Sequence, residues 1–349
     1  MKQWLLPKSS LPKLADTIRQ THRLYAPVRL PDQVAFGEIG EGDPFTLDYA
    51  NARTSVKTLF FPQAETMLRY ERSLDRYNDI SATPVDSVPT VVLGMRPCDA
   101  RGLELLDRVF GQGQYHDPYY LARRQATVVV ALACAAPRQT CFCHAVGGDP
   151  YSGDGGDVLL SESDEAYVAV AQTTKGQEWL ASLGLSEADA GHLATAETIA
   201  EAAHEKLVKM APAAGLEDKL TALFESEVWG EIAEKCIACG TCTYLCPGCH
   251  CFNIQDRVLA NGGIRLRSWD GCMYEGFTVH TSGHNPRPDQ GARWRQRVLH
   301  KFAYLPENVG MYGCVGCGRC ITYCPVRLDI REVIARLRIE TAAQLQGEQ

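Results

Sequence analysis

The chain has 349 residues, of which 45% are hydrophobic, and it combines 15 cysteines with a formal net charge of −7. Its length allows two domains or one large one, and the negative charge, with no dominant basic stripe, argues against nucleic acid as the main partner. Because the sequence contains neither a signal peptide nor an apolar run of membrane-spanning length, we expect a cytoplasmic protein without membrane contact. Its cysteines are then expected to serve metal or redox chemistry rather than disulfides.

The first stretch, residues 1–162, predicts an α/β domain with a parallel-strand core. SSLPKLADTIRQTHRLY (9–25) predicts an opening helix that runs as far as Tyr25. Two apolar runs follow, PTVVLGMRPCDA (89–100) and ATVVVALAC (126–134), with the helical pattern ARGLELLDRVF between them. Strand, helix and strand in this order predict two parallel strands joined by a right-handed crossover.

Four cysteines are expected at one edge of this sheet. Cys98 and Cys134 follow the two predicted strands, and open α/β sheets hold their ligands at that edge. Cys141 and Cys143 lie on the loop after the second strand and can fold back over it. Two interpretations stay open: a third iron–sulfur cluster, or buried, redox-inert thiols beside a different ligand, because the spacing matches no standard cluster run. Asp99, directly after Cys98, can cap the helix that begins there.

The rest of the chain divides into two further stretches. Residues 163–235 are rich in Ala and Glu and predict a mainly helical connector. Residues 236–349 predict a C-terminal domain of helices and loops that carries the remaining cysteines. The expected fold class is therefore α+β: an N-terminal α/β domain, a helical connector and a ferredoxin-type domain for two [4Fe–4S] clusters.

The C-terminal stretch repeats one cysteine pattern. CIACGTCTYLCP (236–247) and CVGCGRCITYCP (314–325) share the spacing C-x2-C-x2-C-x3-C-P, which binds [4Fe–4S] clusters in bacterial ferredoxins. Three thiolates at two-residue intervals can reach three irons of one cubane, and in two-cluster ferredoxins the fourth cysteine of each run ligates the other cluster. We therefore expect two [4Fe–4S] clusters, the first on Cys236, Cys239, Cys242 and Cys324, and the second on Cys246, Cys314, Cys317 and Cys320.

Other interpretations of this stretch were weighed against the clusters. Zinc is the alternative metal, but three cysteines on one tight loop are one too many for a tetrahedral site built from two separated pairs. Cys249, Cys251 and Cys272 lie between the repeats and can bind another metal, shield the clusters or remain buried thiols. The basic segment ARWRQRVLHKF (292–302) is expected to be a solvated helix face; docking to an acidic partner and offsetting the clusters' charge are its alternatives.

Several motifs, in this order, carry a resemblance to a known family. They are FFPQAET (60–66), GMRPCDARGLELLDRVF (94–110), DPYYLARR (117–124), CFC (141–143), CIACGTCTYLCPGCHCF (236–252), WDGC (269–272), SGHNPRP (282–288), HKF (300–302) and CVGCGRCITYCPV (314–326). The chain thereby resembles the iron–sulfur beta subunit of cytoplasmic sulfhydrogenases, which are NAD(P)-linked [NiFe]-hydrogenases. It is also similar to the related A subunit of anaerobic sulfite reductase.

The resemblance implies a subunit that relays electrons between an NAD(P)H-linked flavoprotein subunit and a catalytic [NiFe]-hydrogenase subunit. It implies cluster ligation by the eight repeat cysteines and favours a metal-binding role for Cys98, Cys134, Cys141 and Cys143. The alternatives are the relay subunit of a sirohaem sulfite reductase, and a flavin-binding oxidoreductase in its own right. We expect no catalytic residues, because the sequence shows no convincing nucleophile–base pair or nucleotide fingerprint.

Overall fold

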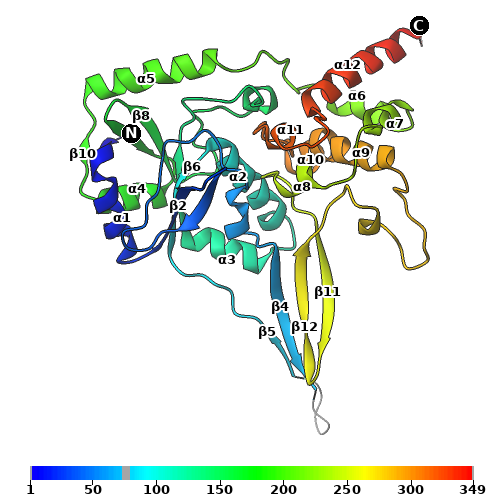
Figure 1. Ribbon diagram of the computed structural model, residues 1–349, viewed down its shortest axis with the longest axis horizontal. Helices are drawn as coiled ribbons and strands as arrows, with labels where there is room; N and C mark the ends of the chain where they lie inside the picture. Colours follow the sequence, from blue (N-terminus) through cyan, green and yellow to red (C-terminus); the bar gives the residue numbers. More distant parts are fainter. Residues whose placement is uncertain (1, 73–78, 348–349) are drawn as a thin grey trace.

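A computed structural model of the chain describes residues 2–72 and 79–347. It mixes helices and strands, as predicted: a large sheet covered by helices, a smaller sheet that projects from the body, and a helical C-terminal part (Figure 1). None of the helices within these two ranges is both long enough and apolar enough to cross a membrane.

The large sheet has eight strands and a parallel centre. In sheet order the strands are β10 (Ser186–Glu187), β1 (Gln3–Pro7), β9 (Ala166–Ala171), β8 (Val158–Ser163), β7 (Thr127–Leu132), β6 (Thr90–Met95), β2 (Arg23–Arg29) and β3 (Val34–Glu38). The four strands β2, β6, β7 and β8 run parallel to one another, and the outer strands pair antiparallel. The strands predicted at 89–100 and 126–134 are β6 and β7, and their parallel pairing is confirmed.

Helices cover both faces of this sheet because β6 and β7 send alternate side chains into two apolar cores. The helices of this part are α1 (Leu11–Arg19), α2 (Pro97–Gly111), α3 (Pro118–Ala126), α4 (Thr174–Ser182) and α5 (Ala190–Glu205). Val91 and Val130 pack with residues of α1 and α4 on one face. Val92 and Val129 pack with residues of α2 and α3 on the other. Strands buried on both faces are expected to be continuously apolar, as these are.

One prediction about an element boundary was wrong. The opening helix ends at Arg19, and Tyr25 belongs to β2, where the alternately buried Leu24 and Ala26 favour a strand. The sheet also continues past residue 162, because β9 pairs with β8 and β1, and β10 pairs with β1. The stretch 163–235, predicted to be mainly helical, thus also contributes two strands to the large sheet.

The C-terminal part has helices of four to 18 residues around an apolar core of its own. These helices are α6 (Glu217–Ala222), α7 (Val228–Ala233), α8 (Thr241–Tyr244), α9 (Gln290–Leu299), α10 (Leu305–Val309), α11 (Arg319–Thr322) and α12 (Ile330–Gly347), with the π-helical turn η5 (His300–Tyr304) between α9 and α10. The described residues also include four 3-10 turns: η1 (Lys8–Ser10), η2 (Val56–Leu59), η3 (Cys143–Val146) and η4 (Glu275–Phe277). Phe142 joins this core from the N-terminal part, together with Trp294 and Phe302.

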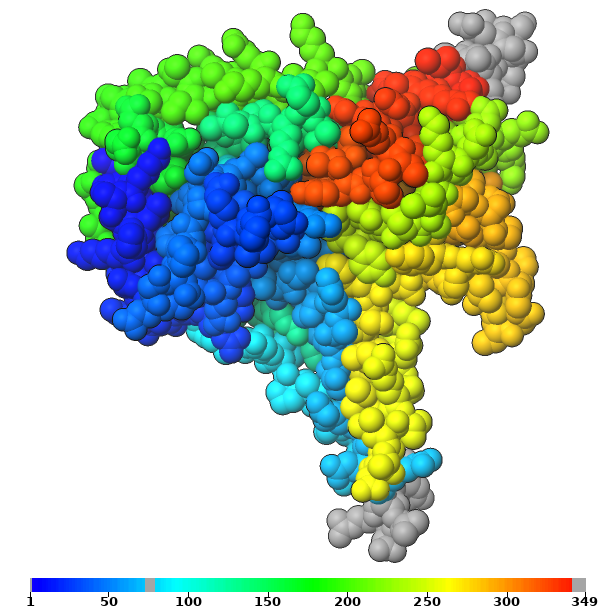
Figure 2. Space-filling view, viewed as in Figure 1, coloured from blue at the N-terminus to red at the C-terminus, as the bar shows by residue number. Residues whose placement is uncertain are grey.

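A second sheet of four antiparallel strands projects from the body, and we call it the arm (Figures 1 and 2). Its strands, in order, are β11 (Phe252–Leu259), β12 (Gly262–Trp269), β4 (Ala64–Glu71) and β5 (Asp79–Ala82). The pairing of β4 with β12 joins the N-terminal and C-terminal parts of the chain. The C-terminal part therefore holds two strands that the prediction of helices and loops did not include.

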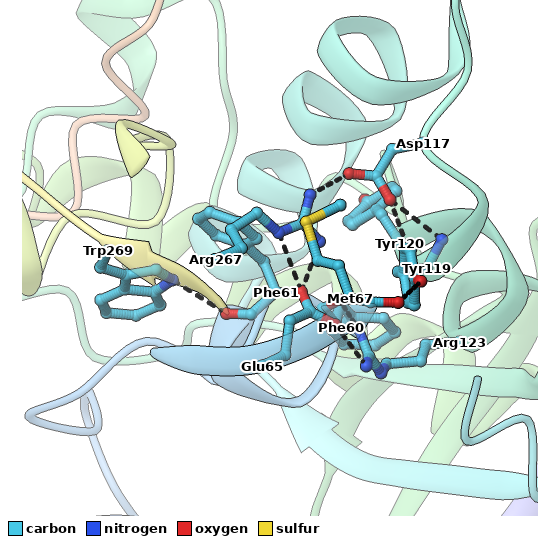
Figure 3. Close-up of polar contacts among 10 residues, drawn as sticks. All are labelled: Phe60, Phe61, Glu65, Met67, Asp117, Tyr119, Tyr120, Arg123, Arg267 and Trp269. Carbon is cyan, nitrogen blue, oxygen red and sulfur yellow. Dashed lines mark hydrogen bonds and ion pairs between the residues drawn. The ribbon is translucent and has the colours of Figure 1, made fainter. Parts of the chain in front are cut away.

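The base of the arm is fixed by one buried arginine (Figure 3). Arg267 of β12 is 2% exposed and forms ion pairs with Glu65 of β4 and with Asp117, which caps α3. Nε1 of Trp269 donates a hydrogen bond to the carbonyl oxygen of Phe61 at 3.1 Å. These contacts hold the arm at a fixed place beside the cysteine-rich part.

Candidate metal centre

Each cysteine repeat folds as a tight loop that leads into a short helix. Gly240 and Gly318, the residues before α8 and α11, have φ angles of 73° and 72°, which side chains disfavour. A Cβ atom at Gly240 would overlap the Tyr274 ring, and one at Gly318 would overlap the backbone and side chain of Thr140. Both repeats therefore depend on glycine at the same position, between the second and third cysteines.

The cysteines of the two repeats line two pockets. The outer pocket is lined by Cys236, Cys239, Cys242, Cys320 and Cys324. The central pocket is lined by Cys246, Cys314, Cys317 and Cys320. Each pocket thus combines cysteines of both repeats, which agrees with the expected exchange of the fourth cysteine, although ligation itself stays a prediction. Cys239 is exposed at the outer pocket, whereas Cys246, Cys314 and Cys317 are buried.

The four cysteines of the N-terminal part line a third pocket. Cys98 lies in the first turn of α2, Cys134 follows β7, Cys143 begins η3, and Cys141 lies two residues before it. We call this the N-terminal pocket; Cys317 also lines it. The carboxyl ends of β6 and β7 therefore bring together the thiols that the sequence placed at that edge.

Burial keeps these thiols protonated at neutral pH. It raises the pKa of Cys141 to about 11 and that of Cys143 to about 12, and it raises the pKa of Cys98 well above the ordinary thiol range. Because thiolate is the form that ligates metal, a metal that binds here must displace these protons. Buried polar atoms without a hydrogen-bond partner, Oδ1 of Asn51 and Nε of Arg96, belong to residues that line the same pocket.

The three pockets are contiguous. Cys320 lines both the outer and the central pocket, and Cys317 lines both the central and the N-terminal pocket. The backbone N–H of Phe142 donates to the carbonyl oxygen of Gly316 at 2.8 Å, which joins the loop of the N-terminal cysteines to the second repeat. The order along the molecule is therefore outer, central, N-terminal.

Within the described ranges, three buried cations donate hydrogen bonds to cysteine residues. Lys301 donates from Nζ to Sγ of Cys246 at 3.3 Å, and Lys57 donates to the carbonyl oxygens of Cys246 and Cys249 at 2.8 and 2.7 Å. Arg297 donates to the carbonyl oxygen of Cys242 at 2.9 Å and lines both the outer and the central pocket. These three side chains are 2–4% exposed. The expectation that 292–302 is a solvated face was wrong for Arg297 and Lys301.

The charge of these cations fits an anionic group in the pockets. Across the described ranges, Lys57, Arg297 and Lys301 have no carboxylate within ion-pair distance. Burying an unpaired charge is costly, so the balancing charge must come from the thiolates and what they bind. A [4Fe–4S] core held by four thiolates is an anion, and the donor set of soft sulfur ligands suits it.

Two histidines beside these cations do not add to the positive charge. His250 and His300 stack edge to face with ring centroids 5.5 Å apart. Burial lowers the pKa of His250 to about 4 and that of His300 to about 3, so both rings are neutral at physiological pH. The positive charge near the central pocket therefore comes from lysine and arginine alone.

The remaining cysteines line none of the three pockets. Sγ of Cys249 lies 4.0 Å from Nη1 of Arg297, and a hydrogen bond between Cys251 and Cys272 lowers the pKa of Cys272 and raises that of Cys251. A structural zinc site needs its ligands around one point. In the parts of the chain that the structure describes, no three His, Cys, Asp or Glu side chains are grouped to hold one metal ion.

Sequence reasoning also missed part of the centre. Asp99, expected to cap α2, instead forms a 2.6 Å ion pair with Arg319 of the second repeat, and both side chains are 1% exposed. Arg319 also donates to the carbonyl oxygen of Ala52 at 2.9 Å. The contact of Lys57 with the backbone of Cys246 and Cys249 could not be predicted, because no metal-binding motif lies near Lys57 in the sequence.

Comparison with known proteins agrees with this geometry. Residues 235–328 match the family described as 4Fe-4S dicluster domain. The chain is 30% identical over 341 residues to the sulfhydrogenase 2 subunit beta of Pyrococcus furiosus. This alignment covers 97% of this chain and 99% of that protein. No solved structure matches the chain.

Proposed function

Because the chain belongs to the family of sulfhydrogenase beta subunits, we propose that it relays single electrons between an NAD(P)H-linked flavoprotein subunit and a catalytic [NiFe]-hydrogenase subunit. The matched 4Fe-4S dicluster domain makes it an iron–sulfur subunit of this type. The name of the relative indicates one subunit among several, and the identities of the two partner subunits belong to the proposal.

The observation that carries this proposal is the contiguity of the three cysteine-lined pockets. Neighbouring pockets share Cys320 on one side and Cys317 on the other. Cofactors separated by one residue are close enough for an electron to pass from one to the next. A chain of sites that ends at the exposed Cys239 is the arrangement expected of a relay.

We assign the ligands as the sequence predicted. Cys236, Cys239, Cys242 and Cys324 would hold the outer cluster, and Cys246, Cys314, Cys317 and Cys320 the central one. We assign a third iron–sulfur cluster to Cys98, Cys134, Cys141 and Cys143. When bound, a [4Fe–4S] cluster accepts and returns one electron at a time.

The chain's own residues do the remaining work. Phe142, Val315 and Ile330 line the central pocket with apolar surface and exclude water from it. Arg297 and Lys301 place positive charge against the thiols, which favours their deprotonated, metal-binding form. Hydride chemistry and hydrogen activation fall to the partner subunits.

Anaerobic purification of the chain alone tests the proposal. The isolated protein should contain about eight irons, or about twelve if the N-terminal pocket is filled, with matching sulfide. It should accept electrons from dithionite and show no turnover with hydrogen, sulfite or NAD(P)H. Turnover by the isolated chain, flavin absorbance, or a colourless protein that contains zinc would each overturn the proposal.

A further inference from the structure

Of the three buried cations that donate to cysteine residues in the described structure, Lys301 is the one that donates to the sulfur of a repeat cysteine. Its Nζ lies 3.3 Å from Sγ of Cys246 and 2.6 Å from the carbonyl oxygen of Gly313. Gly313 directly precedes Cys314, so the ammonium group connects the fourth cysteine of the first repeat to the start of the second. Lys301 itself lines the central pocket and is 4% exposed.

The backbone places this lysine with little freedom. Lys301 lies in η5, a π-helical turn that interrupts the helix between α9 and α10, and such turns are frequent at functional sites. The N–H of Gly313 donates to the carbonyl oxygen of Lys301 at 2.8 Å. A Cβ atom at Gly313 would lie 3.1 Å from Cα of Lys301, so glycine allows this close approach.

The outer pocket receives a different set of donors. Sγ of Cys236 accepts from the side-chain amide of Gln290 at 3.3 Å, and Sγ of Cys324 accepts from the backbone N–H of Leu328 at 3.2 Å. Cys239 lies 3.4 Å from Oγ1 of Thr241. Both groups that donate to these sulfurs are neutral, and the thiol of Cys239 is itself the donor to Thr241. Because Arg297 lines both pockets, Lys301 is the charged group that distinguishes the central pocket from the outer one.

A buried cation stabilises whichever oxidation state is more negative. Reduction adds one negative charge to an iron–sulfur cluster, and hydrogen bonds to its sulfurs and nearby charge set its potential. In a buried site, where water screens little, a charge in direct contact has a larger effect than it would at the surface.

Resting on the proposed function, we propose that Lys301 raises the reduction potential of the central cluster above that of the outer cluster. The central cluster is then reduced before the outer cluster, so an electron that enters at the outer end moves on to the central site. Lys301 acts on the cluster through its charge and its contact with Cys246, and is in this sense a positioning residue.

The test compares three lysine variants. Lys301→Met removes the charge and the donor, Lys301→Gln removes the charge and keeps a donor, and Lys301→Arg keeps the charge. Lys175→Met is the control, because Lys175 of α4 contacts Asp157 and the carbonyl oxygen of Thr127 and lines none of the three pockets. Iron and sulfide contents, measured first, show whether the clusters are present and so test the proposed function separately.

Redox titration followed by electron paramagnetic resonance gives the potentials. We expect Lys301→Met and Lys301→Gln to lower the equilibrium constant for reducing the central cluster at least about tenfold, which is about 59 mV for one electron. The outer cluster, Lys301→Arg and Lys175→Met should titrate as the wild type does. If the central cluster of Lys301→Gln had the wild-type potential, the hydrogen bond and not the charge of Lys301 would set that potential, and the inference would be wrong.

A measurement on the wild type keeps the inference testable if a variant loses its cluster. Of the outer and central clusters, the central one must give its signal first on reduction, with the signals assigned by Cys239→Ser, which alters the exposed ligand of the outer cluster. If the outer cluster is reduced first in the wild type, the inference is wrong even though both clusters are present.

Discussion

At the scale of single residues, the ion pair of Asp99 and Arg319 ties the two halves of the centre together. Asp99 is in the first turn of α2, next to Cys98, and Arg319 lies between two cysteines of the second repeat. Ser55 donates a further hydrogen bond to Asp99 at 2.8 Å. Because a buried pair is costly when one partner is lost, this contact fixes the N-terminal pocket against the central one.

The exchange of the fourth cysteine between the repeats is tested by Cys324→Ala. We expect loss of the outer cluster, about four irons per chain, because Cys324 lines the outer pocket with three cysteines of the other repeat. The matched variant Cys246→Ala should instead damage the central cluster. Iron analysis with Mössbauer or paramagnetic resonance spectra distinguishes the two. Loss confined to the central cluster in Cys324→Ala would reject the assignment.

At the scale of elements, the arm depends on its base. Strand β11 of the arm is exposed along its whole length, and Val258 is 71% exposed. Little burial of apolar side chains therefore stabilises the part of the arm that projects from the body. Arg267 supplies instead a buried anchor against Glu65 and Asp117, with its guanidinium over the ring of Phe61 at 5.1 Å (Figure 3).

Replacing this anchor should loosen the arm without unfolding the body. For Arg267→Met we expect the free energy of local opening in β4 and β12 to fall by about 3 kcal/mol, because Glu65 and Asp117 lose a buried partner. Native-state hydrogen exchange of the arm amides measures this quantity. Arg265→Met, two residues away on the same face, removes only an exposed pair with Asp256 and should change little. Equal effects of the two variants would refute the anchoring role.

The sequence predicted those elements whose pattern is local. β6, α2 and β7 follow one another directly and are continuously apolar or helical, so their order alone defined the unit. The arm was missed because β12 pairs with β4 some two hundred residues earlier, a contact that no local pattern reports. The sequence predicted helix α9 but not its burial. Arg297 of this helix donates to the backbone of Cys242, a contact between distant segments that no local pattern reports.

At the scale of the whole molecule, the three pockets form a connected series that includes residues from both the N-terminal and the C-terminal part of the chain. Cysteine spacing predicted that two sites would each combine cysteines of both repeats, and the strand edge predicted the gathering of the N-terminal thiols. The contiguity of the three was not predictable, because it depends on how the second repeat packs against the loop at Phe142.

The third cluster can be tested without disturbing the other two. In Cys98→Ala combined with Cys134→Ala, we expect about four irons fewer than in the wild type, with the signals of the outer and central clusters retained. Cys251→Ala, whose thiol lines none of the pockets, is the control and should keep all its iron. An unchanged iron content in the double variant would mean that these thiols hold no cluster.

The residues that line the outer and central pockets lie far apart in the sequence, so the ribosome synthesises them at different times. Both pockets need residues on either side of the arm strands β11 and β12, and both include Ile330 near the start of α12. A nascent chain can therefore form most of its large sheet before either pocket exists. On the proposed ligand assignment, delivery of iron and sulfide to these two sites is a late event in biogenesis, which must wait until synthesis has passed the second repeat.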